Sequence, residues 1–137
     1  MKFTLSWLKD HLDTSASLDE IADKLTLVGL EVEALVDPSD TFANFEVAEI
    51  IATAPHPEAD RLQICTVKSG GGEQQLVCGA PNARAGLVGI LAQEGAVIPA
   101  SGMVLGKAKI RGVESRGMMC SGAELGLNDD HDGIIEL

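Results

Sequence analysis

The sequence predicts an α+β chain in which a short helical segment precedes a small domain made of strands. Apolar residues recur with a helical period only before residue 41, and from residue 45 they alternate in short runs. The 15 glycines suit the tight turns of a small closed barrel or sandwich. With four aromatic residues (Phe3, Trp7, Phe42 and Phe45), the core is expected to consist of Val, Ile, Leu, Ala and Met.

The clearest helix signal lies between residues 17 and 29. Ser17 and Glu20 have the spacing of a capping box, in which each side chain accepts from the other residue's backbone N–H. The apolar residues that follow share one helix face: Leu18, Ile21, Ala22, Leu25 and Val28. Gly29 provides a helix stop. A shorter helix is expected around residues 7–12, and the weak alternation of residues 30–36 predicts a strand.

A polar breaker at Asp37–Asp40 marks the expected boundary between a helical segment, residues 1–41, and a strand domain, residues 42–137. A proline-bracketed loop is expected at residues 54–60, and a single helical turn at residues 121–125. Short strands are predicted at residues 47–53, 62–67, 75–78, 87–92, 103–110 and 133–137.

Charge is distributed unevenly along the chain. The net charge of −11 argues against sequence-independent nucleic-acid binding by the chain as a whole. Residues 1–43 hold 3 basic and 9 acidic groups, whereas residues 44–127 are close to neutral. Four cations of the middle stretch fall within ten residues: Lys107, Lys109, Arg111 and Arg116. The sequence therefore predicts a local basic feature on an acidic chain.

Two explanations fit this basic feature. On an extended strand, Lys107, Lys109 and Arg111 lie on one face, about 6.6 Å apart, while Ala108 and Ile110 point into the core. That spacing matches successive backbone phosphates in order of magnitude. Like charges on one face repel one another unless an anion relieves them, so a phosphate contact and an ordinary solvated face both remain open.

No residue pattern predicts a catalytic or metal site. The three histidines lie in separate segments, and the cysteines at positions 65, 78 and 120 lack a CxxC spacing, which favours reduced thiols buried on strands. A Cys–His nucleophile pair remains open, and the acidic cluster at 129–132 favours a solvated turn over a metal site. Without a signal peptide or a membrane span, the protein is expected to be soluble and cytoplasmic.

Three segments in order carry a family resemblance: HPEADRL (56–62), QLVCGAPNARAG (75–86) and KIRGVESRGMMCS (109–121). They resemble the tRNA-binding domain of the endothelial-monocyte-activating-polypeptide type, which implies a five-stranded OB-fold β-barrel. The flanks MKFTLSWLKDHLD, LDEIADKLTLVGLEVE and DDHDGIIEL resemble the start of bacterial phenylalanine–tRNA ligase beta subunits.

The resemblance implies an accessory, non-catalytic tRNA-binding module of an ATP- and magnesium-dependent ligase. That enzyme pairs two alpha with two beta subunits and joins phenylalanine to its tRNA, and residues 1–41 are then half of a split domain. In this interpretation, Lys107, Lys109, Arg111 and Arg116 contact phosphate, with Arg61, Arg84 and Asn82 as weaker candidates from adjacent loops. A free-standing tRNA-binding protein and a protein–protein docking barrel are the alternatives.

Overall fold

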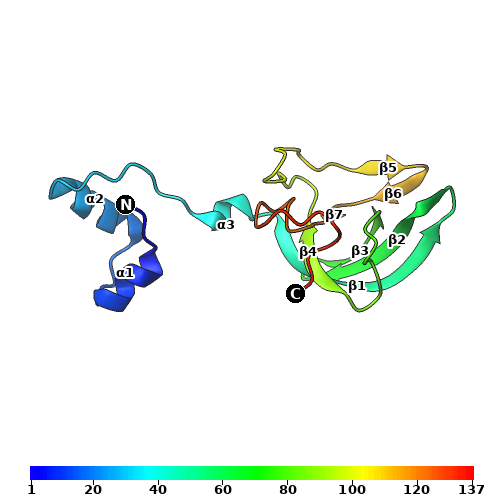
Figure 1. The fold of residues 1–137 in the computed structure, drawn as a ribbon, viewed down its shortest axis with the longest axis horizontal. Helices are drawn as coiled ribbons and strands as arrows, with labels where there is room; N and C mark the ends of the chain where they lie inside the picture. The colour runs from blue at the N-terminus through cyan, green and yellow to red at the C-terminus, as the bar shows by residue number, and fades with distance from the viewer. The chain divides into compact units, whose positions relative to one another are not determined.

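The computed structural model describes residues 1–137 and confirms the α+β class (Figure 1). The chain divides into two compact units, Met1–Asp37 and Pro38–Leu137. The first unit holds two short helices, and the second holds one helical turn and all of the strands. None of the helices has the length and apolar character needed to cross a bilayer.

The helices of the first unit begin at local caps. In α1 (Leu5–His11), the Thr4 hydroxyl accepts from the Trp7 N–H at 3.2 Å. At the start of α2 (Leu18–Leu27), the predicted capping box is confirmed. The Ser17 hydroxyl accepts from the Glu20 N–H at 3.3 Å, and the Glu20 carboxylate accepts from the Ser17 N–H at 2.8 Å. These reciprocal bonds satisfy two N–H groups that a helix start leaves unpaired.

After α2 the structure differs from the sequence prediction. Gly29 takes φ +94°, the left-handed conformation expected at a helix stop. The predicted strand at residues 30–36 is wrong, because this segment has no regular structure. No strand of the first unit is available to pair with it, and a lone extended segment leaves its backbone groups without sheet partners.

The first unit contains no buried side chain. The large apolar residues exposed on it are Met1, Phe3, Trp7, Leu12, Leu27, Val28, Leu30, Leu35 and Val36. A segment below about 40 residues rarely folds without outside support. The caps therefore define its helices locally, while the segment lacks a core of its own.

The second unit is built on a five-stranded antiparallel sheet in the order β3-β2-β1-β4-β7. It begins with the helical turn α3 (Pro38–Thr41). The sheet strands are β1 (Phe45–His56), β2 (Ala59–Ser69), β3 (Gly72–Cys78), β4 (Val88–Ala92) and β7 (Met118–Met119). A separate two-stranded hairpin consists of β5 (Ala108–Ile110) and β6 (Val113–Ser115).

Strand β1 is the central strand of the sheet. It pairs with β2 along most of its length and with β4 near its start. Figure 1 shows β1 and β2 as a long curved hairpin, and the register shifts between Ile50 and Ala52. The loop predicted at residues 54–60 is wrong. Pairing continues to His56 opposite Ala59, so the turn is only two residues long. Proline is tolerated near strand ends and bulges, where its missing N–H breaks little pairing.

The barrel closes between edge strand β3 and the segment 114–116. The Arg116 N–H donates to the Gln75 carbonyl at 3.0 Å, and the Gln75 amide donates to the Glu114 carbonyl at 3.0 Å. The Gln74 amide donates to the Arg116 carbonyl at 2.7 Å, and the Val77 N–H donates to the Ser115 hydroxyl at 3.0 Å. These bonds satisfy an edge that would otherwise present unpaired backbone groups.

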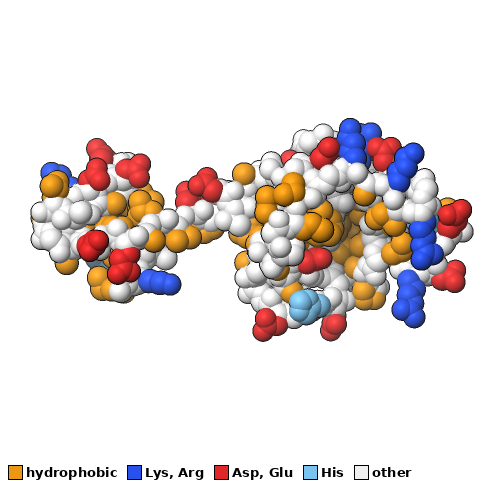
Figure 2. Space-filling view, turned by 90° about the horizontal axis from the view of Figure 1, so that it is seen from above, with side chains coloured by type: hydrophobic (Ala, Val, Ile, Leu, Met, Phe, Trp, Pro, Cys, Tyr) orange, Lys and Arg blue, Asp and Glu red, His pale blue; other side chains and the backbone are white.

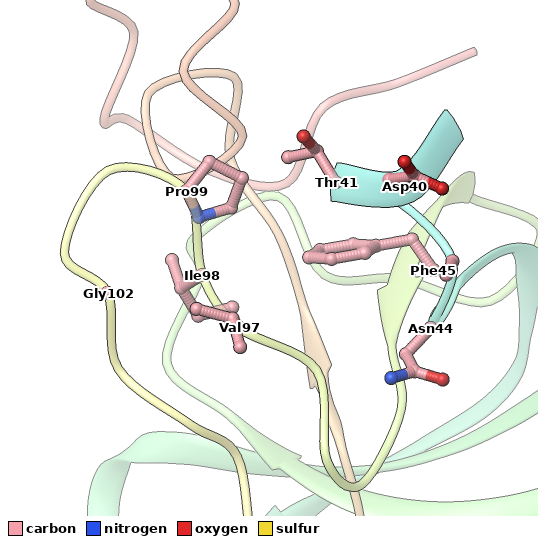
Figure 3. Close-up of a pocket in the computed structure, with 9 residues that line it drawn as sticks. Asp40, Thr41, Asn44, Phe45, Val97, Ile98, Pro99 and Gly102 are labelled. Carbon is pink, nitrogen blue, oxygen red and sulfur yellow. The ribbon is translucent and has the colours of Figure 1, made fainter. Parts of the chain in front are cut away.

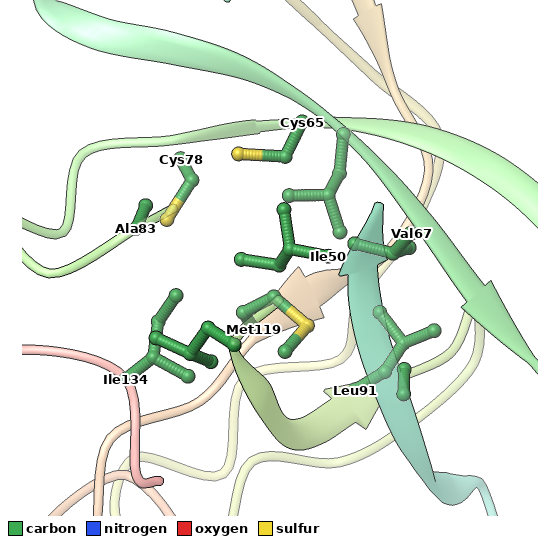
Figure 4. Packing of buried hydrophobic residues seen from close by; sticks show 11 residues of the cluster. Ile50, Cys65, Val67, Cys78, Ala83, Leu91, Met119 and Ile134 are labelled. Atoms are coloured by element: carbon green, nitrogen blue, oxygen red, sulfur yellow. The ribbon is translucent and has the colours of Figure 1, made fainter. Parts of the chain in front are cut away.

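The core inside the sheet is aliphatic, as the composition predicts (Figure 4). Its fully buried members include Ile50, Val67, Leu76 and Leu91, at 0% exposure. A second cluster forms around Ile98, where the Phe42 and Phe45 rings meet edge to face at 5.4 Å. Every residue of both clusters belongs to the second unit.

Two predicted strands late in the chain are mostly irregular. Of residues 103–110, only the last three form a strand, and Val104 makes an isolated bridge to Val97. Residues 133–137 form no assigned strand, yet the Leu137 N–H donates to the Val88 carbonyl at 3.0 Å. The predicted turn at 121–125 is present, with the Leu125 N–H bonded to the Ser121 carbonyl at 3.3 Å.

Because both apolar clusters lie within the second unit, a chain of residues 38–137 should fold alone. We expect a cooperative thermal transition within about 3 °C of that of the full chain, since a loss of 1 kcal/mol already shifts Tm by about 4–8 °C in a domain of this size. Circular dichroism of both chains measures this. Loss of the cooperative transition in the shorter chain would contradict the assignment of the core.

Candidate nucleic-acid interface

The four cations of residues 107–116 lie on or directly beside the β5–β6 hairpin, whose two-residue turn is Arg111-Gly112. Both residues have positive φ, +47° and +84°. A hairpin of this length usually places Asn-Gly or Asp-Gly there, because side chains other than Asn and Asp tolerate this conformation poorly. The strain of such a residue is about 1–3 kcal/mol and persists only where the surroundings hold it. Arg111 is the one non-glycine residue of the chain with positive φ.

The arrangement of the cations differs from the predicted strand face. Arg111 lies in the turn, so it does not continue the face of Lys107 and Lys109. Ala108, predicted to point into the core, is exposed, and Ile110 is only half-buried. The reason is that β5 pairs with β6 alone, outside the main sheet, and therefore has no core beneath it.

One carboxylate lies among these cations. The Arg116 Nε lies 2.7 Å from Glu114 Oε1, and Lys109 stands opposite Glu114 in the hairpin register. The pKa of Glu114 is lowered, first by the Arg116 hydrogen bond and charge and further by Lys107 and Lys109. Residues 107–116 thus hold four cations and one anion, for a net charge of +3.

The hairpin tip is bonded to the β1–β2 turn, which belongs to the HPEADRL motif. The Arg111 Nη1 donates to the Glu58 carbonyl at 2.9 Å, and His56 Nε2 lies 3.0 Å from the Ile110 carbonyl oxygen. The exposed side chain of Arg61 follows this turn at the start of β2. Figure 2 shows Lys and Arg side chains along one edge of the second unit, with acidic side chains among them.

The two remaining predicted residues hold the C-terminal segment instead. Asn82 Nδ2 donates to the Ile134 carbonyl at 2.8 Å, and Asn82 Oδ1 accepts from the Ile134 N–H at 2.9 Å. Both terminal nitrogens of Arg84 donate to the Glu136 carboxylate, at 2.9 and 2.8 Å. No hydrogen bond or ion pair connects this cluster with the hairpin. The structure thus groups Lys107, Lys109, Arg111 and Arg116, and leaves Asn82 and Arg84 separate.

Two surface hollows occur elsewhere on the second unit. One, of ≈ 270 Å³, is walled by Phe45, Val97, Ile98 and Pro99, with the Phe45 ring reaching across it (Figure 3). Its walls are mainly apolar, and Asp40 is the only charged group that lines it. No Lys or Arg lines this hollow, so it provides no cation for an anionic ligand.

The second hollow, of ≈ 370 Å³, has Cys78, Glu124 and His131 among the residues that line it. All three cysteines are free and buried, and none is hydrogen-bonded to a histidine. The interaction of the Cys78 thiol with the neighbouring Cys65 thiol lowers the pKa of Cys78 and raises that of Cys65. Figure 4 shows the two sulfur atoms on neighbouring strands. Without a bonded base, this hollow lacks the nucleophile–base arrangement that covalent catalysis uses.

No three His, Cys, Asp or Glu side chains converge closely enough to hold a metal ion. The acidic cluster at 129–132 forms local turns, in which the Asp132 N–H donates to the Asp130 carboxylate at 2.9 Å and the Asp130 N–H donates to the Asn128 side chain at 3.0 Å. The residues present therefore do not form a magnesium site. The cationic hairpin is the feature of the chain best suited to an anionic partner.

The sequence prediction missed the contacts of His56 and the turn at Arg111-Gly112. A signal for the turn exists, since a two-residue Arg-Gly step separates the alternating runs 107–110 and 113–115. The bond from His56 to Ile110 has no comparable signal, because it joins residues 54 positions apart.

Comparison with protein families matches residues 45–137 to a family described as a putative tRNA binding domain. Phenylalanine–tRNA ligase beta subunits are similar to the whole chain. That of Rhodospirillum rubrum is 64% identical over 137 residues, and that of Rhodopseudomonas palustris is 59% identical over 139 residues. The chain spans only 17% of the length of each of these relatives.

A solved structure with a related fold is that of a MetRS-related protein from Pyrococcus horikoshii. The match has a TM-score of 0.50 and 20% sequence identity, and it covers 76% of this chain and 86% of that one. At this level of identity the likeness concerns the fold alone. It agrees with the five-stranded barrel described above.

The Glu136 contact generates a pH-dependent prediction. Hydrogen bonds from Arg84 and then from Asn82 lower the pKa of the Glu136 carboxyl to about 2. A folded-state pKa below the unfolded value of about 4.3 adds stability that is complete above that value and is lost as the pH falls through the folded pKa. Glu136→Gln should therefore lower Tm slightly at pH 7 and have a much smaller effect near pH 2.

Thermal unfolding of both proteins between about pH 7 and pH 2, followed by circular dichroism, measures this difference. Glu73→Gln, the same change at an exposed position of β3, is the matched control. A difference between wild type and Glu136→Gln that stays constant over the whole range would rule out the ion pair as its cause.

Proposed function

The chain belongs, over residues 45–137, to the putative tRNA-binding domain family, and from this premise we propose that it is the accessory tRNA-binding module of a phenylalanine–tRNA ligase beta subunit. The observation that carries the proposal is the cationic hairpin, which holds four cations against one carboxylate on an otherwise acidic chain. The similarity to beta subunits extends through the N-terminal unit. A free-standing tRNA-binding protein would not account for that.

Binding through this module depends on phosphates. Barrels that bind single strands tightly stack bases on exposed aromatic rings, each stack being worth about 1–3 kcal/mol. The only aromatic residues of the second unit, Phe42 and Phe45, pack on each other beside the second core cluster. Contacts to phosphate oxygens position a protein without reading sequence. We therefore expect weak binding, in the range of about 10⁻⁴ to 10⁻⁶ M typical of non-specific contacts.

The proposed contact residues are Lys107, Lys109, Arg111 and Arg116, with Arg61 beside them. Lys107 and Lys109 are exposed and make no hydrogen bond within the chain, so their ammonium groups are available to phosphate. Arg116 is paired with Glu114 and would exchange that partner for a phosphate. Arg84 and Asn82 are weaker candidates, because their polar groups already bind the segment 134–136.

In this proposal, the residues that catalyse aminoacylation belong to other parts of the enzyme. In the proposed assembly, the beta subunit joins an alpha subunit in an α2β2 heterotetramer in the cytoplasm. ATP and magnesium are used there to attach phenylalanine to its tRNA. No three potential metal ligands of this chain converge on one site. Its residues 1–41 would form half of a split domain, and residues 42–137 the tRNA-binding domain.

Salt-dependent binding tests the contact residues. If four cations each replace about one counterion, log K should fall with log salt with a slope of roughly −3 to −4, from about −0.7 to −0.9 per phosphate. Replacing Lys107 and Lys109 together with Ala should make the slope less negative by about 1.4 to 1.8. Fluorescence anisotropy with labelled tRNA at several salt concentrations measures both values.

Two matched variants sharpen this test. Lys2→Ala with Lys68→Ala changes the net charge equally at positions outside the hairpin and should leave the slope nearly unchanged. Glu114→Gln removes the internal carboxylate and should tighten binding, because Arg116 no longer has a competing partner. Equal slopes for the hairpin double variant and the wild type, with both folded, would favour the docking-barrel alternative.

The module should not activate phenylalanine by itself. It has no bonded nucleophile–base pair and no metal site. We expect no phenylalanine-dependent ATP–pyrophosphate exchange above background from the purified chain. Exchange that depended on phenylalanine would contradict the non-catalytic role.

A further inference from the structure

His56 is a buried histidine that the proposed phosphate contacts do not use. It is 5% exposed and ends strand β1 within the HPEADRL motif. Its Nδ1 accepts from the Glu58 N–H at 3.1 Å, and its Nε2 lies 3.0 Å from the Ile110 carbonyl oxygen. A neutral imidazole carries one proton, so a ring that accepts at Nδ1 donates at Nε2. Both edges of the ring are thus in use, one within the β1–β2 turn and the other toward the hairpin.

A second bond joins the same two turns. The Arg111 Nη1 donates to the Glu58 carbonyl at 2.9 Å. Two consecutive residues of the hairpin tip, Ile110 and Arg111, are therefore held by the two ends of one short turn. Strand β5 has no other strand partner than β6, so these bonds are what connects its tip to the barrel wall.

The backbone of Arg111 gives an independent sign that this junction is held in place. Its φ of +47° disfavours any residue other than Gly, Asn or Asp. Such a conformation persists where neighbouring contacts determine it. The bonds from Arg111 to Glu58 and from His56 to Ile110 are the contacts present on either side of that strained residue.

We propose that His56 is a positioning residue for phosphate binding, which latches the tip of the β5–β6 hairpin to the β1–β2 turn and so holds Lys107, Lys109 and Arg111 in a fixed arrangement. The inference rests on the proposed tRNA-binding function for its consequence, but the latch itself is a property of the free chain. Preorganised cations bind more tightly than mobile ones, because less conformational freedom is lost on binding.

Two conservative substitutions test the hydrogen bonds of the two ring nitrogens of His56 one at a time. In His56→Asn the amide oxygen can replace Nδ1 and keep the Glu58 N–H bond, but the side chain is too short to reach Ile110. In His56→Gln the amide nitrogen can take the place of Nε2 and keep the bond to Ile110. His131→Asn, at an exposed position, is the matched control.

Hydrogen exchange of the β5–β6 amides in the 137-residue chain, with β1–β2 amides as internal reference, reads out the latch. For His56→Asn we expect hairpin protection to fall by about threefold to tenfold, as for loss of one buried hydrogen bond, while β1–β2 protection changes little. Affinity for labelled unfractionated tRNA should fall by a similar factor. His56→Gln and His131→Asn should both match the wild type.

If His56 acts only within the β1–β2 turn, the order of the two variants is reversed. His56→Asn then matches the wild type in hairpin protection and tRNA affinity, and His56→Gln loses both. That result would overturn the proposed latch. Unchanged hairpin protection in a folded His56→Asn chain would also overturn it. If the wild type shows no affinity for tRNA, the proposed function fails, and hydrogen exchange still decides the latch.

A measurement on the wild type does not depend on the stability of the variants. Imidazole ¹⁵N chemical shifts should show His56 protonated at Nε2 and bare at Nδ1, with a slowly exchanging Nε2 proton close to Ile110. A ring protonated at Nδ1, or an Nε2 proton in rapid exchange with water, would contradict the bond on which the latch depends.

Discussion

The bonds between strand β3 and the segment 114–116 are the constraint on which the second unit depends. They close the barrel at an edge where the sheet itself offers no strand partner. The same bonds anchor β6, since Glu114 and Ser115 take part in them. The same hydrogen bonds therefore close the barrel around its core and attach the base of the hairpin. The His56 and Arg111 bonds add a second attachment at the tip.

How far the sequence could predict this arrangement depended on the range of each signal. The capping box at Ser17 and the glycine stop at Gly29 act over a few residues, and both predictions are correct. The alternation of residues 30–36 is equally visible in the sequence, but a strand also needs a partner, and none is present in that unit. The same limit applies to residues 103–110, where alternation predicts a core strand and only a short external hairpin strand forms.

For the candidate site, the residue types were more predictable than their geometry. The cluster of cations at 107–116 is evident from counting charges. The prediction that these cations share one strand face was wrong, because the positive φ of Arg111 places this residue in a turn. An arginine at a turn position that favours Asn or Gly is a local conflict of the kind found at functional sites. The pairing of Arg84 and Asn82 with the segment 134–136 could not be predicted, since it links residues more than 50 positions apart.

The aliphatic core has a consequence for optical spectroscopy. The chain has one tryptophan, Trp7 on α1, and no tyrosine, so the second unit absorbs near 280 nm through neither residue type. Intrinsic tryptophan emission therefore reports directly on the helical unit, in which the Trp7 ring lies edge-on to His11 at 6.2 Å. The strands of the second unit contain no tryptophan or tyrosine. Tryptophan emission would therefore follow the helical unit without a contribution from the barrel.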